Sequence, residues 1–217
     1  MAAASSQRNQ RMHWGVFILV PMLWWILLPP FHIVPIGKIP HEIATQSFDP
    51  DAIVEKFWSE DLPGLVDAAV DAGMLMAKLE EDREAAAKQY GHRLGLSGKS
   101  VYFVSGNGWV QDIQGSKILI ALSEGGAVSV LISKGPVFGN AVRDGSGLLN
   151  VSDYGNSQNF NSISLEINRR VEERVLPLLD ERVEKGSKIH FVGGVEVSDH
   201  AASILPLKII PVRIELP

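Results

Sequence analysis

The chain contains no cysteine among its 217 residues. Without thiols it cannot form disulfides, zinc–thiolate sites or iron–sulfur clusters, and it cannot use a thiol nucleophile or carry a thioether-linked lipid. Basic residues are fewer than acidic ones, 20 against 25, so the formal net charge is −5. A protein that neutralises nucleic-acid phosphates needs a basic surface, and this balance therefore argues against a nucleic-acid partner.

Acidic residues are absent from residues 1–30, whose charged side chains are Arg8 and Arg11 alone. An uncharged, strongly apolar run extends from Trp14 to Phe31. As a helix this run would span roughly 27 Å, close to the thickness of the hydrocarbon core of a bilayer. The sequence therefore predicts one membrane-spanning helix near the N-terminus.

We interpret residues 12–30 as a transmembrane signal-anchor and residues 1–11 as a cytoplasmic tail, because basic residues stay on the cytoplasmic side. The remainder would lie in the periplasm, attached to the inner membrane by a single pass. A cleaved signal peptide is one alternative, although the run ends at 27–31 in Leu-Leu-Pro-Pro-Phe, without the small residues of a cleavage site. A buried core helix is the other.

The segment after the apolar run divides into a tether and a helical region. Residues 31–48 contain proline and glycine with no clear period, and we expect a tether there. Residues 49–92 predict a helical subdomain. The side chain of Asp49 can cap the first helix of this subdomain. Pro50, which follows it, suits the first helical position.

Residues 98–217 are rich in predicted strands. Residues 123–126, Ser-Glu-Gly-Gly, separate two short apolar runs and indicate a hairpin. A long inserted helix is expected at about 158–185, where apolar residues recur every four positions, and Pro177 should bend or split it. Pro206 and Pro211 favour an edge position for the last strand.

Two nine-residue segments in this region resemble each other. Residues 98–106 and 186–194 share Gly, Phe, Val and Gly at matched positions, and each opens a predicted strand. The similarity indicates either a duplicated unit or two strands that pair with each other. Together with the helices, these strands predict an α+β fold.

Four polar residues are the candidate ligand-binding residues. Arg143 and Asp144 lie in the glycine-rich passage 135–147, which we expect to be a loop, and a guanidinium there could grip a carboxylate or a sugar hydroxyl. The alternative is an ion pair that holds the loop in place. Asp153 and Asn159 belong to a polar cluster before the long helix, where such residues either cap the helix or bind vicinal hydroxyls.

Enzymatic chemistry has weaker support in the sequence. A hydrolase could use Asp144, Asp153 or His190, provided that two of these side chains approach each other in a pocket. No two histidines have the spacing of metal ligands, and we expect neither a metal site nor a cofactor.

Several segments resemble one bacterial family, the predicted periplasmic lipoproteins known as domain of unknown function 2291. They are Ile-Val-Pro-Ile at 33–36, Phe-Asp-Pro-Asp at 48–51 with Trp58, Gln-Tyr-Gly at 89–91, the passage 135–144, Asn159, Asn168 and the pattern from 191 to 212. Their order and spacing, more than any one motif, carry the resemblance.

The resemblance implies an OB-like β-barrel with a helical subdomain and genes placed beside those of sugar ABC transporters. It implies no established activity. The family typically carries a lipid-modified cysteine just before the stretch at 33–36, whereas this chain has Phe31 in that region. We therefore expect the apolar helix to anchor the protein without a lipid.

These observations predict a non-enzymatic, membrane-anchored periplasmic protein that binds or docks near a sugar ABC transporter. Its partners would be the inner membrane, through residues 12–30, and either transporter components or a small sugar ligand. An envelope hydrolase and a ligand-free structural scaffold are the alternative functions.

Overall fold

The computed structural model describes residues 48–93 and 98–216, which belong to one compact unit that starts at Phe48. The predicted cytoplasmic tail and signal-anchor, and the tether up to Ser47, lie outside the described residues. Within the described residues, no helix combines the length and the apolar character that crossing a bilayer requires.

The first part of this unit is mainly helical. Its elements are α2 (Pro50–Lys56), a π-helical turn (Phe57–Asp61), α3 (Leu62–Ala68), the short strand β1 (Val70–Asp71), α4 (Ala72–Glu81) and α5 (Arg83–Tyr90). Asp49 caps α2 by accepting hydrogen bonds from the N–H groups of Asp51 and Ala52, at 3.0 and 3.2 Å. The predicted start of the first helix is therefore confirmed.

The sheet contains β1, which pairs parallel with β2, and five longer strands. These are β2 (Lys99–Gln114), β3 (Lys117–Ala121), β4 (Val130–Ser133), β5 (Lys188–Ser198) and β6 (Leu207–Glu215). The predicted hairpin is confirmed, since β3 and β4 pair antiparallel. β4 pairs with β6, β6 with β5, and β5 with β2. Because β2 also pairs with β3, these strands pair in a closed ring.

The two similar segments of the sequence lie side by side in this sheet. β2 and β5 pair antiparallel without interruption from Lys99 opposite Ser198 to Trp109 opposite Lys188. Of the two interpretations of the similarity, the paired strands are the one that the structure confirms.

The last strand is not at an edge, which corrects the prediction from its prolines. β6 lies between β4 and β5, and only Leu207–Ile209 of β6 pair with β4. Pro211 lies beyond that pairing, opposite Gly193 at an irregularity in the β5 ladder. A proline is tolerated there because the ladder is already interrupted.

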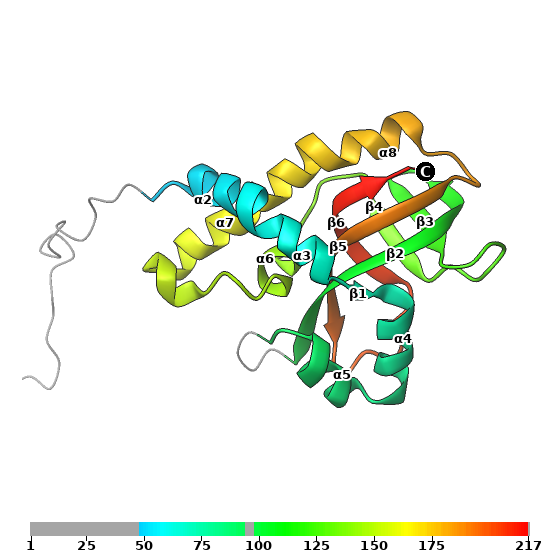
Figure 1. The fold of residues 1–217 in the computed structure, drawn as a ribbon, viewed down its shortest axis with the longest axis horizontal. Coiled ribbons are helices and arrows are strands. Elements are labelled where there is room, and N and C mark those ends of the chain that lie inside the picture. Colours follow the sequence, from blue (N-terminus) through cyan, green and yellow to red (C-terminus); the bar gives the residue numbers. More distant parts are fainter. Residues whose placement is uncertain (1–47, 94–97, 217) are drawn as a thin grey trace, which may run out of the picture. The chain divides into compact units, whose positions relative to one another are not determined.

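The predicted long helix is present in three segments: α7 (Ser157–Arg170), a π-helical turn (Val171–Val175) and α8 (Leu176–Arg182). Pro177 lies in the first turn of α8, where its missing N–H is not needed, so the predicted interruption is confirmed. Figure 1 shows α2 beside α7, and the two helices are in contact. The apolar face of α7 and α8 joins one continuous core with the sheet, which includes Ile163, Ile167, Leu179 and Phe191.

The glycine-rich passage was expected to be a loop. This prediction is wrong in part, because the passage contains a short helix, α6 (Ala141–Gly145). α6 packs against β5 at Gly194, where a Cβ atom would lie 2.5 Å from the carbonyl of Ala141. The absent side chain of Gly194 therefore lets the backbone of α6 approach the strand closely.

Candidate functional site

Arg143, the main candidate from the sequence, is buried within α6 and has only 4% of its surface exposed. Its Nε donates to Asp144 Oδ1 at 2.6 Å, and its Nη1 donates to the carbonyl of Phe160 at 2.9 Å. The guanidinium carbon also lies 3.7 Å from the centre of the Phe160 ring. These contacts fix α6 to α7 and correspond to the structural alternative for the Arg143–Asp144 pair.

The other two candidates surround Tyr154. Asn159 Nδ2 donates to the Tyr154 carbonyl at 3.0 Å, and Asn156 caps α7 through the Asn159 N–H. Asp153 is exposed on the 3₁₀ turn Val151–Tyr154. The Tyr154 ring stacks on Phe160, with ring centres 5.8 Å apart.

These contacts connect three of the candidates through one aromatic pair and leave Asp153 at the surface. Burial, and then the charges of Asp153 and Asp61, raise the pKa of the Tyr154 phenol, so this phenol stays protonated. A ligand-binding role for the four residues stays a prediction, since the contacts found are with the protein itself.

The three residues of the hydrolase alternative are not joined to one another. Asp144 is paired with Arg143, and Asp153 lies on its exposed turn. His190 lies on β5, opposite Asn107 and Glu215. Among the hydrogen bonds of the described residues, none connects two of these side chains. Nor do residues 48–93 and 98–216 contain a cluster of three His, Asp or Glu side chains suited to a metal ion.

A groove that the sequence did not indicate lies along α7 and α8. The segment after β4 runs antiparallel to these helices and is bound to them at three points. Lys134 Nζ lies 2.9 Å from Asp180 Oδ1, the Val137 N–H donates to Glu172 at 2.6 Å, and Asn168 donates to the Gly139 carbonyl at 3.0 Å.

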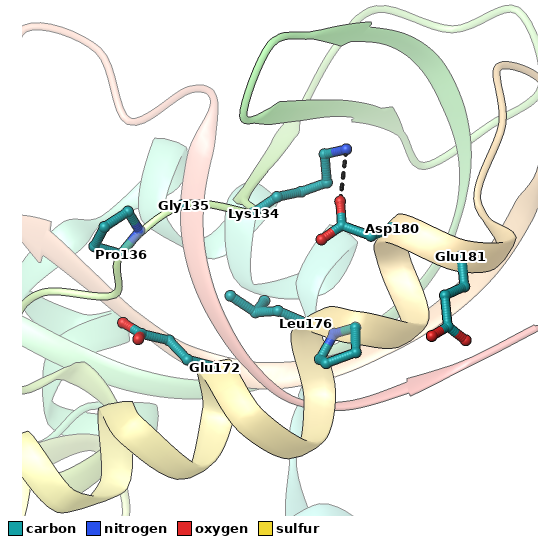
Figure 2. Close-up of a pocket in the computed structure, with 8 residues that line it drawn as sticks. Lys134, Gly135, Pro136, Glu172, Leu176, Asp180 and Glu181 are labelled. Carbon is teal, nitrogen blue, oxygen red and sulfur yellow. Dashed lines mark ion pairs between the residues drawn. The ribbon is translucent and has the colours of Figure 1, made fainter.

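Between this segment and the helices is an open cavity of about 390 Å³, which we call the α8 groove. Figure 2 shows Glu172 at one end, Leu176 in the middle and the Lys134–Asp180 pair beyond it. The groove thus combines a buried apolar floor with carboxylates. Its lining residues are Lys134, Gly135, Pro136, Glu172, Leu176, Pro177, Asp180 and Glu181.

Two large apolar side chains are exposed on the elements that border the α8 groove, Phe138 on the segment after β4 and Leu165 on α7. Phe138 is 81% exposed, and it lies between Val137 and Gly139, which are both bound to the helices. Leu165 is 69% exposed and lies on α7, three residues before Asn168, whose buried side chain donates to the Gly139 carbonyl. We call Phe138 and Leu165 the apolar rim.

The sequence pattern of the long helix indicates that Leu165 is exposed. The buried positions of the long helix recur every four residues from Ile163, and Leu165 falls outside that series. No comparable signal marks Phe138, because a phenyl group in a Pro- and Gly-containing segment could equally be buried.

Comparisons with known proteins agree with this fold. An OB-fold protein from Thermotoga maritima, known from its crystal structure, superposes with a TM-score of 0.70 at 23% identity, over 79% of this chain and 100% of that one. The predicted α+β class is thus confirmed, and the chain has an OB-fold protein as a structural neighbour. No curated protein matches the chain. Residues 22–215 match the family model of the predicted periplasmic lipoproteins, DUF2291, and the chain therefore belongs to this family.

Proposed function

We propose that this protein is a non-enzymatic accessory of the periplasmic face of the inner membrane, which docks to a component of a sugar ABC transporter. In this proposal residues 12–30 anchor the chain, residues 1–11 are cytoplasmic, and the ring of strands is an OB-type barrel outside the membrane. The periplasmic description of the family supports the location.

The apolar rim is the observation that carries the docking proposal. Exposed phenyl and isobutyl groups on neighbouring elements cost free energy in water, and burying both against a partner would recover roughly 2–4 kcal/mol. Aromatic side chains at the centre of an interface often dominate binding. The rim is therefore a more suitable contact surface than the buried Arg143.

A sugar ligand near Tyr154 is the second candidate. Asp153 and Asn159 could still present oxygen or amide groups to vicinal hydroxyls. Docking is favoured because Arg143 and Asn159 already make intramolecular hydrogen bonds, which a sugar would have to replace.

Photo-crosslinking in cells tests the docking. A photoreactive residue replaces Phe138 or Leu165 in the full-length chain, and Met74, an exposed apolar residue of α4, serves as the matched control. We expect crosslinks to the permease or to the sugar-binding protein of an ABC transporter from positions 138 and 165 but not from 74. Equal yields at the three positions, or products without a transporter component, would overturn the proposal.

Two further measurements test the anchor and the ligand alternative. Release of the native protein by osmotic shock would contradict the anchor. Calorimetric titration of the detergent-solubilised chain with monosaccharides tests the ligand, and binding that Asp153→Asn abolishes would favour a sugar site over docking.

A further inference from the structure

The short helix α2 is attached to α7 mainly through charged groups. Within α2 the buried side chain is that of Val54, whereas α4 buries four apolar side chains. On α7 the contact is made by Arg170, whose side chain is only 2% exposed. Two carboxylates of α2, those of Asp51 and Glu55, pair with this buried guanidinium. The position of α2 therefore depends on charge more than that of α4 does.

The Arg170 guanidinium is surrounded by oxygen atoms of both helices. Its Nη2 donates to the carbonyl and to Oδ1 of Asp51, both at 2.9 Å. Its Nη1 donates to Glu55, and its Nε donates to Glu166 Oε1 at 3.1 Å. Every nitrogen of the buried guanidinium thus has a partner, and three of these partners are carboxylates that carry charge at neutral pH.

Neighbouring side chains of the long helix complete the charged contact. Arg169 donates to Asp51 Oδ1 at 3.2 Å, and Arg174 donates to Glu55 Oε2 at 3.2 Å. Arg169 also binds Glu173 through Nη1. The charged groups around Arg170 are therefore two carboxylates from α2, two from the long helix and two further arginines.

The carboxylates make this attachment dependent on pH. A hydrogen bond from Arg170 lowers the pKa of Glu55 below its ordinary 4.5, and a hydrogen bond from Arg169 lowers the pKa of Glu166. A lowered carboxyl pKa stabilises the attached state above the ordinary pKa, and this contribution is lost as the pH falls through the lowered value. Protonation then leaves Arg170 buried without anionic partners, which favours an opening that returns its charge to water.

We propose that α2 is an acid-sensitive latch, which the ion pairs of Arg170 hold against α7 at neutral pH and which detaches in acid before the rest of the unit unfolds. Because α2 follows the proposed tether 31–48, a detached α2 lengthens that tether. Each released residue spans about 3.3 Å when extended, in place of about 1.5 Å in a helix. This lengthening rests on the proposed membrane anchor, whereas the latch itself does not.

Thiol reactivity tests the latch, because the chain has no cysteine of its own. Val54→Cys places a single thiol in α2 and Leu75→Cys places one in α4, at positions that are both 0% exposed. The full-length chain in detergent reacts with a dipyridyl disulfide, which also labels thiols in acid. Division by the rate of the exposed Ala52→Cys at the same pH removes the intrinsic pH dependence of the reagent. We expect the protection of Val54→Cys to fall about tenfold from pH 7 to about pH 4, and that of Leu75→Cys to stay unchanged.

A second substitution locates the cause of the opening. Arg170→Met replaces the buried guanidinium with an apolar side chain, so the protection of Val54→Cys should no longer depend on pH. The control Arg213→Met, at an exposed arginine of β6, should keep the fall in acid. Should Val54→Cys fail to fold, Ile53→Cys, half-buried on the same helix, repeats the measurement.

Three results would overturn the latch. They are protection of Val54→Cys that does not change with pH, a fall that Leu75→Cys shares, and a fall that persists in Arg170→Met. The latch and the proposed function can fail separately. Release of the protein by osmotic shock would refute the anchor and leave the latch standing, whereas unchanged protection of Val54→Cys would refute the latch and leave the anchor and the docking standing.

Discussion

The segment that follows β4 has two halves with opposite exposure. In the first half, up to Asn140, an aromatic side chain, Phe138, projects into solvent. In the second half, within α6, the charged side chain of Arg143 is buried. This reverses the usual preference, in which phenyl groups are buried and guanidinium groups are exposed.

Contacts within the protein explain why Arg143 is buried, but none explains why Phe138 is exposed. Arg143 has a carboxylate, a carbonyl and an aromatic ring as partners, so its burial is compensated within the protein. Phe138 gains nothing from its exposure in the isolated chain. An unexplained exposed aromatic is therefore a better indicator of a partner than a charged residue whose contacts are complete.

Substitution of Arg143 should lower the free energy of unfolding more than the other substitutions proposed here. Arg143→Met leaves Asp144 without its partner in a nearly buried position, and we expect the free energy of unfolding in urea to fall by about 3 kcal/mol. Arg213→Met, at an exposed arginine of β6, is the control and should change it by less than about 0.5 kcal/mol. Equal effects would mean that the buried pair is not structural.

Gly194 provides the next test of the buried half. Gly194→Ala places a methyl group against the backbone of Ala141, so α6 must shift, and we expect a loss of about 2 kcal/mol. Gly64→Ala, in α3 with open space around the new methyl group, should instead raise stability by up to about 1 kcal/mol. A neutral Gly194→Ala would show that α6 does not depend on this close approach.

A second buried arginine extends the comparison to pH. Arg170 pairs with Glu166 within α7 and with Glu55 and Asp51 of α2, so the last two pairs join α7 to α2. A hydrogen bond from Arg169, and a further one from Arg170, lower the pKa of Glu166 below its ordinary 4.5. A lowered carboxyl pKa stabilises the folded state above the unfolded pKa, and the contribution disappears as pH falls through the folded value.

Glu166→Gln should therefore cost roughly 1 kcal/mol at pH 7, and the difference from the unmodified chain should shrink as the pH falls below 4.5 and through the lowered pKa of Glu166. Urea unfolding across that range measures it, with Glu124→Gln as the control. A difference that persists in acid would assign the effect of Glu166 to packing.

The smallest effect on stability is expected at the apolar rim. Phe138→Ser and Leu165→Ser remove exposed side chains, so the free energy of unfolding should stay within about 0.5 kcal/mol of the unmodified chain. The crosslink from position 165 should nevertheless weaken in Phe138→Ser, and the crosslink from position 138 should weaken in Leu165→Ser. A stability loss as large as that of Arg143→Met would make Phe138 part of the fold.

Several elements could be predicted because their causes are local. Asp49 and Pro50 start α2, the glycines at 125 and 126 turn β3 into β4, and Pro177 interrupts the long helix. Capping, turn geometry and the missing N–H of proline each act within a few residues. The similarity of 98–106 and 186–194 likewise left only the choice between duplication and pairing.

The position of β6 and the state of Arg143 could not be predicted in this way. Pro211 alone indicates an edge, and the irregularity at Gly193 that accommodates it belongs to another strand. In the sequence, Arg143 in a glycine-rich passage resembles a ligand-binding residue. Its contact with the Phe160 ring of α7 is seen only in the folded chain.

The sequence by itself determined where several of the helices and strands begin, the absence of thiol chemistry and the membership of the α+β class, because these depend on composition and on neighbours along the chain. Only the tertiary structure decided that Arg143 is buried, that Phe138 is exposed and that a groove runs along α8. Exposure is a property of contacts between residues far apart in the chain, and those contacts exist only once the segment after β4 lies against α7 and α8.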